Sequence, residues 1–117
     1  MAKILVADDD IHIRGLIKLI LNEHQIIEAS DGTDAVTKFI STKPDLVLLD
    51  VIMPKMNGVE ACKKIRALPE GKTAKILMMS AKTIVEMKEV EAVEADDLIT
   101  KPFKPQDLKK KVQEFLS

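Results

Sequence analysis

The chain has 117 residues, with 18 basic and 19 acidic side chains and a formal net charge of -1, and this length predicts one soluble domain, residues 1–117, with a single core. The balanced charge gives no basic surface for binding a nucleic acid, and three phenylalanines without Trp or Tyr are too few aromatic residues for stacking on bases. The apolar runs are too short to span a membrane. Four glycines, at 15, 32, 58 and 71, exclude the standard dinucleotide and P-loop fingerprints, and the single cysteine, Cys62, fits a reducing compartment, so we expect a cytoplasmic protein.

Short apolar runs, each followed by polar residues, predict buried strands. Continuous apolar runs are typical of parallel strands that are covered on both faces. One run is more polar than the others and suits a sheet edge. The predicted strands are residues 4–7, 25–29 (the more polar run), 46–49, 76–79 and 98–99.

Segments with helical spacing separate these runs. Asn57 followed by Glu60 resembles a capping box that opens one of the helices. Alternation of buried strands with helices of this length predicts an open, doubly wound α/β domain. The predicted helices are residues 11–22, 33–41, 57–68, 83–93 and 105–116.

Polar residues stand at the predicted ends of four strands. Asp8 and Asp9 follow the first, Asp50 the third, Ser80 the fourth and Lys101 the fifth. Open parallel sheets bind ligands beyond the carboxyl ends of their strands. We therefore expect these side chains to converge on one crevice.

Carboxylates at Asp8, Asp9 and Asp50 would repel one another unless a cation lay between them. An all-oxygen donor set without histidine or thiolate favours Mg²⁺. Such a cation, with the ammonium of Lys101 and the hydroxyl of Ser80, suits a phosphoryl group. Asp50 is the natural acceptor, since a carboxylate can act as the nucleophile in phosphoryl transfer.

Several motifs in order resemble the receiver domain of bacterial response regulators over the whole chain. They are Asp8-Asp9, Asp50-Val51-Ile52-Met53-Pro54 with Asn57-Gly58, Met79-Ser80-Ala81, and Lys101-Pro102-Phe103. The resemblance implies a flavodoxin-like, doubly wound five-stranded parallel sheet of order 2-1-3-4-5 with five helices.

For the metal, the resemblance implies Asp50 as the phosphoacceptor, Asp9 as a direct Mg²⁺ ligand and Asp8 as the holder of a metal-bound water. The backbone carbonyl of Ile52 would complete the protein's share of the coordination shell. The apolar side chain of Ile52 cannot orient a water, so we expect slow hydrolysis of the phosphoryl group.

For the switch, the resemblance implies that Ser80 hydrogen-bonds a phosphoryl oxygen, that Lys101 pairs with it, and that the Lys101-Pro102 bond is cis. Leu98 stands where the family has a switch aromatic. Ring rotation coupled to Ser80 cannot operate here, although an aliphatic side chain at Leu98 can still repack. We expect Ser80, Leu98 and Lys101 to form the switch.

The primary interpretation is a stand-alone, monomeric two-component receiver, with a fragment of a longer regulator as the alternative. It would take a phosphoryl group from a sensor histidine kinase or a histidine phosphotransfer protein with Mg²⁺, and then signal by altered contacts or phosphorelay. It would not be an enzyme beyond its own phosphorylation and dephosphorylation.

Two surfaces are candidate binding sites for protein partners. Residues 86–97 hold six acids against one lysine, and residues 101–111 hold five lysines against one acid. We expect a charge-complementary downstream target on the helix 4, strand 5, helix 5 face, with an ordinary solvated face as the alternative. Leu19 and Ile11 fall off the core stripe of the first helix and suggest a docking patch for a helical partner.

Two rival functions stay open. A metal-dependent phosphatase of the haloacid-dehalogenase type also uses an aspartate nucleophile, with a second acid two residues later, and Asp8 and Asp10 have that spacing. Turnover lost in Asp8→Asn but kept in Asp50→Asn would select it. A receiver fold that binds partners without phosphorylation is the other rival, which five intact site positions argue against.

Overall fold

The computed structural model describes residues 1–81, 83–91 and 93–117. Position 92 and the side chain of Glu91, which belong to the predicted acidic segment 86–97, lie outside the described part, and position 92 also falls in the predicted helix 83–93. The strands are β1 (Lys3–Ala7), β2 (Gln25–Ala29), β3 (Leu46–Asp50), β4 (Ile76–Ser80) and β5 (Asp97–Thr100).

The five strands form one parallel sheet of order β2-β1-β3-β4-β5. This order confirms the expected flavodoxin-like topology. It also places the most polar predicted strand, β2, at an edge, where a strand is less completely covered.

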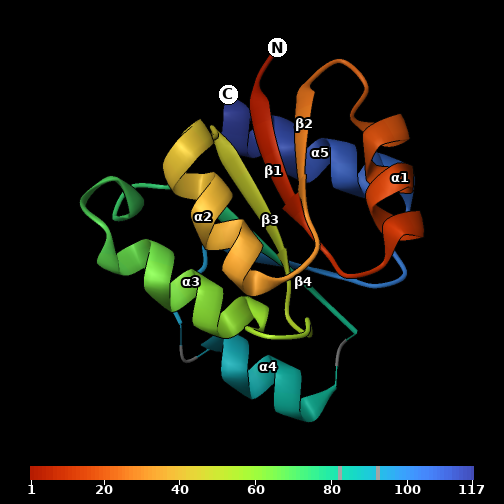
Figure 1. Cartoon of the computed structure of the whole chain (residues 1–117). Coiled ribbons are helices and arrows are strands. Elements are labelled where there is room, and N and C mark those ends of the chain that lie inside the picture. The colour runs from red at the N-terminus through yellow and green to blue at the C-terminus, as the bar shows by residue number, and fades with distance from the viewer. Residues whose placement is uncertain (82, 92) are drawn as a thin grey trace.

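Helices cover both faces of the sheet. They are α1 (Ile11–Ile20), α2 (Gly32–Thr42), α3 (Gly58–Ala67), α4 (Ile84–Glu91) and α5 (Pro105–Leu116), with a short 3₁₀ helix η1 (Pro69–Gly71) that the sequence pattern did not predict. Figure 1 shows α2 and α3 on one face, α1 and α5 on the other, and α4 at the lower side, toward which the arrow of β1 points. In the described part of the chain, no helix has the length and apolarity needed to cross a membrane.

The core consists of two hydrophobic layers, one on each face of the sheet. Leu5 and Leu49 belong to the layer under α2 and α3, and Val6 and Leu48 belong to the layer under α1 and α5. These four side chains have no exposed surface. Because successive strand residues point to opposite faces, a strand buried on both faces is apolar throughout, which is why the runs in the sequence were continuous.

Side-chain caps set the starts of α1 and α3. Asp10 accepts a hydrogen bond from the backbone N–H of His12 at 2.8 Å, and Asn57 accepts one from Glu60 at 2.9 Å. The second cap confirms the helix start predicted at Asn57. The predicted helix 11–22 ends earlier, at Ile20, because the buried Leu21 packs in the core with a non-helical backbone at the cap.

Glycine allows two loops to pack backbone against backbone beside Asp50. The N–H of Gly58 donates to the carbonyl of Val51 at 2.9 Å, and that of Gly32 donates to the carbonyl of Met56 at 2.8 Å. A Cβ atom on Gly58 would lie 2.0 Å from the carbonyl oxygen of Asp50. The segment after Asp50 is therefore fixed by a contact that no other residue permits.

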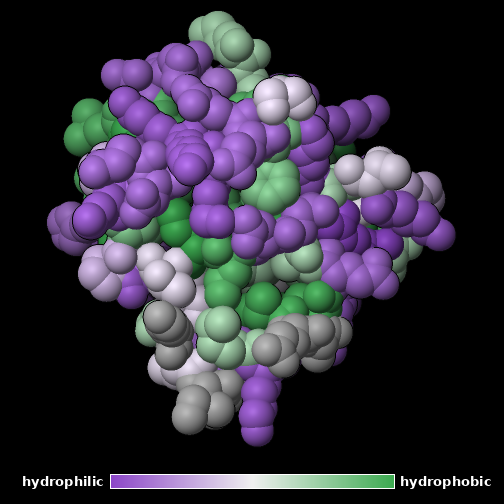
Figure 2. Space-filling model, turned by 180° about the vertical axis from the view of Figure 1, so that it is seen from behind, coloured by the Kyte–Doolittle hydropathy of each residue, from purple (hydrophilic) through white to green (hydrophobic). Residues whose placement is uncertain are grey.

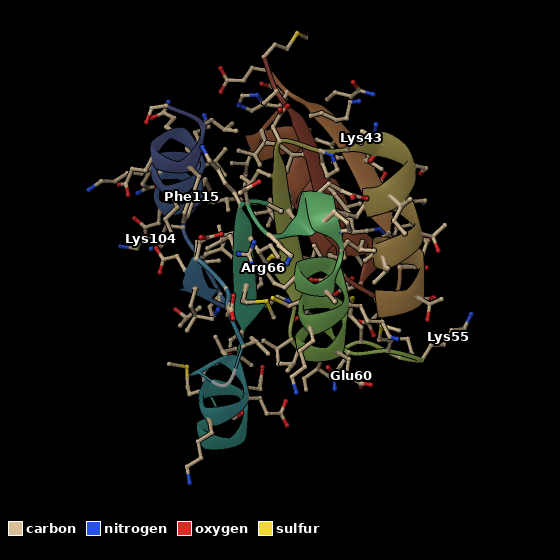
Figure 3. All side chains as sticks on the ribbon, turned by 90° about the vertical axis from the view of Figure 1, so that its left-hand side faces the viewer. Lys43, Lys55, Glu60, Arg66, Lys104 and Phe115 are labelled. Atoms are coloured by element: carbon tan, nitrogen blue, oxygen red, sulfur yellow. The ribbon has the colours of Figure 1, made fainter. Side chains whose placement is uncertain are left out.

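Arg66 lies at the opposite end of the sheet from Asp50, near the starts of β4 and β5. Its guanidinium donates to the carbonyls of Gly71, Ala74 and Glu94, at 2.9 Å to Gly71 and 2.7 Å to Glu94, and pairs with Asp96 at 3.0 Å. Figure 3 shows Arg66 between α3 and the strands. Arg66 thus ties α3 to the segments that precede β4 and β5, and so supports the register of both strands.

Candidate functional site

The carboxyl ends of β1, β3 and β5 bring charged side chains together. Lys101 Nζ lies 2.6 Å from Asp8 Oδ2 and 3.2 Å from Asp50 Oδ2. Asp8 and Lys101 are 93 positions apart in the sequence. The convergence expected from the sheet topology is therefore present for Asp8, Asp50 and Lys101, although the role of each residue stays a prediction.

Backbone hydrogen bonds continue the sheet into the site. The N–H of Val51 donates to the carbonyl of Met79 at 2.9 Å, and that of Lys101 donates to the carbonyl of Ser80 at 2.7 Å. The N–H of Asp8 donates to the carbonyl of Ala29 at 3.1 Å. The site side chains thus leave rigid strand ends, which keeps their mutual positions fixed.

Three carboxylates form a candidate metal centre. Asp8 and Asp50 are buried and Asp9 is exposed, and each offers one oxygen atom within 4.8 Å of the others. Only oxygen donors are present in this cluster, which is the ligand set that a hard divalent cation such as Mg²⁺ prefers. The cluster therefore fits the predicted metal. Ile52 follows in the same loop and is 58% exposed.

Electrostatics make the cluster favourable for cations. Burial, followed by the negative charge of Asp8, raises the pKa of Asp50 from its ordinary 3.8 to about 6, although Lys101 opposes the rise. Burial lowers the pKa of Lys101, but the hydrogen bond to Asp8 and the charge of Asp50 outweigh it and raise the pKa above its usual value. Lys101 is therefore a fixed ammonium, and the acids beside it still favour further positive charge.

A fourth carboxylate, from α4, holds Ser80. The Ser80 hydroxyl donates to Glu86 Oε1 at 3.2 Å, and the backbone N–H of Ala81 donates to the same oxygen at 3.1 Å. Thr83 Oγ1 donates to Glu86 Oε2 at 2.8 Å. Burial raises the pKa of Glu86, but the hydrogen bonds from Thr83, Ala81 and Ser80 lower it below its ordinary value.

Glu86 corrects one sequence interpretation. The charge pattern counted Glu86 among the acids of an outer face, yet its side chain is buried. The reason is local: Thr83 and Glu86 have the spacing of a capping box at the start of α4, directly after Ser80, so the carboxylate turns inward. That spacing is the signal by which the sequence could have predicted this contact.

Leu98 contributes an aliphatic side chain to β5. It is half-buried, lies opposite Met78 in the strand register, and packs against the hydrophobic layer under α2 and α3. Its predicted part in the switch stays a prediction. The cis Lys101-Pro102 peptide bond, in contrast, is present as expected.

Asp10 lies outside the carboxylate cluster of the described residues. Its side chain is exposed and caps α1, while its backbone N–H donates to Asp8 Oδ1 at 2.9 Å. The phosphatase alternative requires Asp8 and Asp10 to act together on a substrate. A carboxylate committed to a helix cap does not favour that alternative.

The two predicted surfaces have clear positions. Leu19 and Ile11 on α1 are 74% and 64% exposed, as their place off the core stripe predicted. Figure 2 shows a mainly hydrophilic face over α5. Lys111 on α5 pairs with Asp97 on β5 at 2.7 Å, so opposite charges there are partly matched within the domain.

Comparison with known proteins gives matches over nearly the whole chain. Residues 4–113 match the family model described as the response regulator receiver domain. The alkaline phosphatase synthesis transcriptional regulatory protein PhoP of Bacillus subtilis is 41% identical over 97% of this chain, and the transcriptional regulatory protein ResD of the same organism is 40% identical over 97%.

Solved structures agree with these matches. The chemotaxis protein CheY4 of Vibrio cholerae is similar with a TM-score of 0.90 and 35% identity, covering 98% of each chain. The two Bacillus regulators are longer: the chain spans 48% of the length of each.

Proposed function

Because the chain belongs to the response regulator receiver domains of two-component systems, we propose that Asp50 accepts a phosphoryl group from a sensor histidine kinase or a histidine phosphotransfer protein. The observation that carries the proposal is the position of Asp50. Its carboxylate is buried beside the ammonium of Lys101 and within the reach of Asp8 and Asp9.

The reaction needs little from the protein beyond position and charge. An oxygen of Asp50 forms a bond to phosphorus while the phosphorus–nitrogen bond of the donor phosphohistidine breaks, and the departing imidazole keeps the electron pair and takes a proton from solvent. Lys101, which already contacts Asp50, stabilises the charge on the phosphoryl oxygens. The protein thus promotes its own phosphorylation without being an enzyme toward other substrates.

Asp8, Asp9, Asp50 and the backbone carbonyl of Ile52 would hold Mg²⁺. The bound cation supplies positive charge opposite the phosphoryl oxygens. Asp8 also holds Lys101 in place, because its second oxygen is bonded to the backbone N–H of Asp10 and cannot turn away without losing that contact. Loss of Asp8 would therefore weaken both the metal site and the placement of Lys101.

The lifetime of the phosphoryl group is proposed to be long. Hydrolysis requires a water that is oriented toward phosphorus, and Ile52, two residues after the acceptor, offers only an apolar side chain at the exposed side of the site. Ile52→Asn would supply a hydrogen-bonding group there and should shorten the lifetime. A lifetime of seconds that is unchanged by Ile52→Asn would contradict this proposal.

Signalling is proposed to run through protein contacts. The exposed Leu19 and Ile11 of α1 suit a helical partner such as the kinase or phosphotransfer protein, and the face of α4, β5 and α5 suits a downstream target. PhoP and ResD are named as transcriptional regulatory proteins. Our expectations of no nucleic-acid contact, a monomer and a cytoplasmic location concern this domain and stay predictions.

The test is incubation with Mg²⁺ and a small acyl phosphate, followed by intact mass measurement. We expect a phosphoryl adduct with the unaltered protein and none with Asp50→Asn. Asp10→Asn is the matched control: it makes the same substitution close by, at an exposed helix cap where Asn serves as well as Asp, and it should keep the adduct. Absence of an adduct from any donor, or an adduct on Asp50→Asn, would overturn the proposal.

A further inference from the structure

The backbone of Ser80 has little freedom to move. Ser80 ends β4 and is wholly buried. Its carbonyl accepts the N–H of Lys101 at 2.7 Å, and the carbonyl of the preceding Met79 accepts the N–H of Val51 at 2.9 Å. Since β4 is bonded to a neighbouring strand segment on either side, rotation of the Ser80 side chain between staggered positions is the least costly way to move its hydroxyl.

Glu86 places a buried negative charge next to that hydroxyl. Glutamate is almost never fully buried without partners. Here Ser80, Ala81 and Thr83 all donate to the carboxylate, and the backbone N–H of Glu86 donates to Thr83 Oγ1 at 3.1 Å. The carboxylate is therefore part of the first turn of α4, and the Ser80 hydroxyl is attached to that turn through it.

One proton limits what the Ser80 hydroxyl can donate. A serine hydroxyl donates a single hydrogen bond, so its proton serves either Glu86 or an oxygen of a phosphoryl group on Asp50. Donation to the phosphoryl group leaves the buried carboxylate of Glu86 with one donor fewer, which is unfavourable. Movement of Glu86, and hence of the start of α4, would relieve that loss.

We propose that Glu86 is a positioning residue for Ser80, which opposes donation of the Ser80 hydroxyl toward Asp50 and couples that donation to the first turn of α4. The inference rests on the proposed function of Asp50. It also connects Ser80 to the surface of α4 by a route that does not depend on Leu98, whose aliphatic side chain carries no polar group and no ring.

Equilibrium binding of beryllofluoride, a mimic of the phosphoryl group, tests the coupling. Calorimetry in the presence of Mg²⁺ gives the dissociation constant for the unaltered protein, Glu86→Gln, Ser80→Ala and the double variant. Gln keeps the shape of Glu but accepts a weaker, neutral hydrogen bond, so Glu86→Gln should bind about fivefold more tightly. In the Ser80→Ala background the same substitution should change binding by less than about twofold.

A control separates this role from helix stability. Glu89→Gln makes the same substitution one turn later in α4. The Glu89 side chain is half-buried, and its carboxylate forms no hydrogen bond with the described residues, so this variant should leave binding unchanged. If Glu86→Gln does not fold, Glu86→Asp replaces it, since the shorter side chain withdraws the carboxylate from Ser80 and should give the same tightening. The amide resonance of Ala81, which bonds to the same oxygen, reports whether Glu86 moves.

The outcomes distinguish the inference from the function beneath it. Binding to the unaltered protein, with equal effects of Glu86→Gln in both backgrounds or weaker binding, would overturn the inference and leave the function of Asp50 in place. No binding of beryllofluoride to the unaltered protein would overturn the proposed function and the inference with it. Tightening that depends on Ser80 supports both.

Discussion

Replacing Asp50 with Asn should make the metal-free protein more stable at neutral pH. Asp50 is buried beside Asp8, which raises its pKa from 3.8 to about 6. Because the folded chain then binds more protons than the unfolded chain between these pH values, stability falls as the pH rises through this window. The full rise corresponds to about 3 kcal/mol of destabilisation above pH 7.

The expected gain is smaller than that limit, because the amide of Asn at this buried position has a desolvation cost of its own. We expect Asp50→Asn to be about 1–2 kcal/mol more stable than the unaltered protein at pH 7.5 and the advantage to shrink by about 2 kcal/mol at pH 4. Urea unfolding at the two pH values, in the presence of a chelator, measures it. Acids far from Asp50 are the same in both proteins, so their contributions cancel in the difference. An advantage independent of pH, or a less stable variant at pH 7.5, would refute the reasoning.

Three further predictions concern the same site. Mg²⁺ at ten times its dissociation constant should stabilise the unaltered protein by about 1.4 kcal/mol, and Asp9→Asn should lose this gain in a thermal unfolding assay; an undiminished gain would exclude Asp9 as a ligand. Gly58→Ala should lower the free energy of unfolding by at least about 2 kcal/mol, since its Cβ would lie 2.0 Å from the Asp50 carbonyl oxygen. Gly15→Ala within α1, whose Cβ meets no atom within 4 Å, should instead raise it by about 0.5–1 kcal/mol. Equal effects of the two substitutions in urea unfolding would contradict the packing argument. Lys101→Met leaves the buried acids without their ammonium, so both the yield of acyl phosphate adduct by mass and the stability should fall; an unchanged yield would remove Lys101 from the proposed mechanism.

The sheet and the convergence of its strand ends were predictable because both depend on patterns that are local in the sequence. A run such as residues 46–49 is apolar because both of its faces are covered, and the polar residue that follows marks the strand end. Once the order of parallel strands is given, Asp50 and Lys101 must meet at one edge of the sheet. The alternation of strands and helices predicted the parallel sheet, and the resemblance to receiver domains supplied its strand order.

The contact of Glu86 with Ser80 was missed because Glu86 lies in a segment rich in acidic residues, and such residues are normally expected to be exposed to solvent. Its burial depends on three donors brought together by the end of β4 and the start of α4. The η1 turn and the four-way contact of Arg66 were missed for a similar reason. A single turn is too short to show a periodic pattern. Every residue has a backbone carbonyl, so the residue types do not show which carbonyls Arg66 binds.

The ion pair between Lys101 and Asp8 joins residues separated by 93 positions. It can form only after β5 has added to the outer side of β4, because β3 and β4 lie between β1 and β5 in the sheet. A chain still emerging from the ribosome, or one with β5 detached, would present Asp50 without its ammonium. If Asp50 accepts a phosphoryl group as proposed, completion of the sheet by β5 is therefore also the step that completes the charge arrangement of the site.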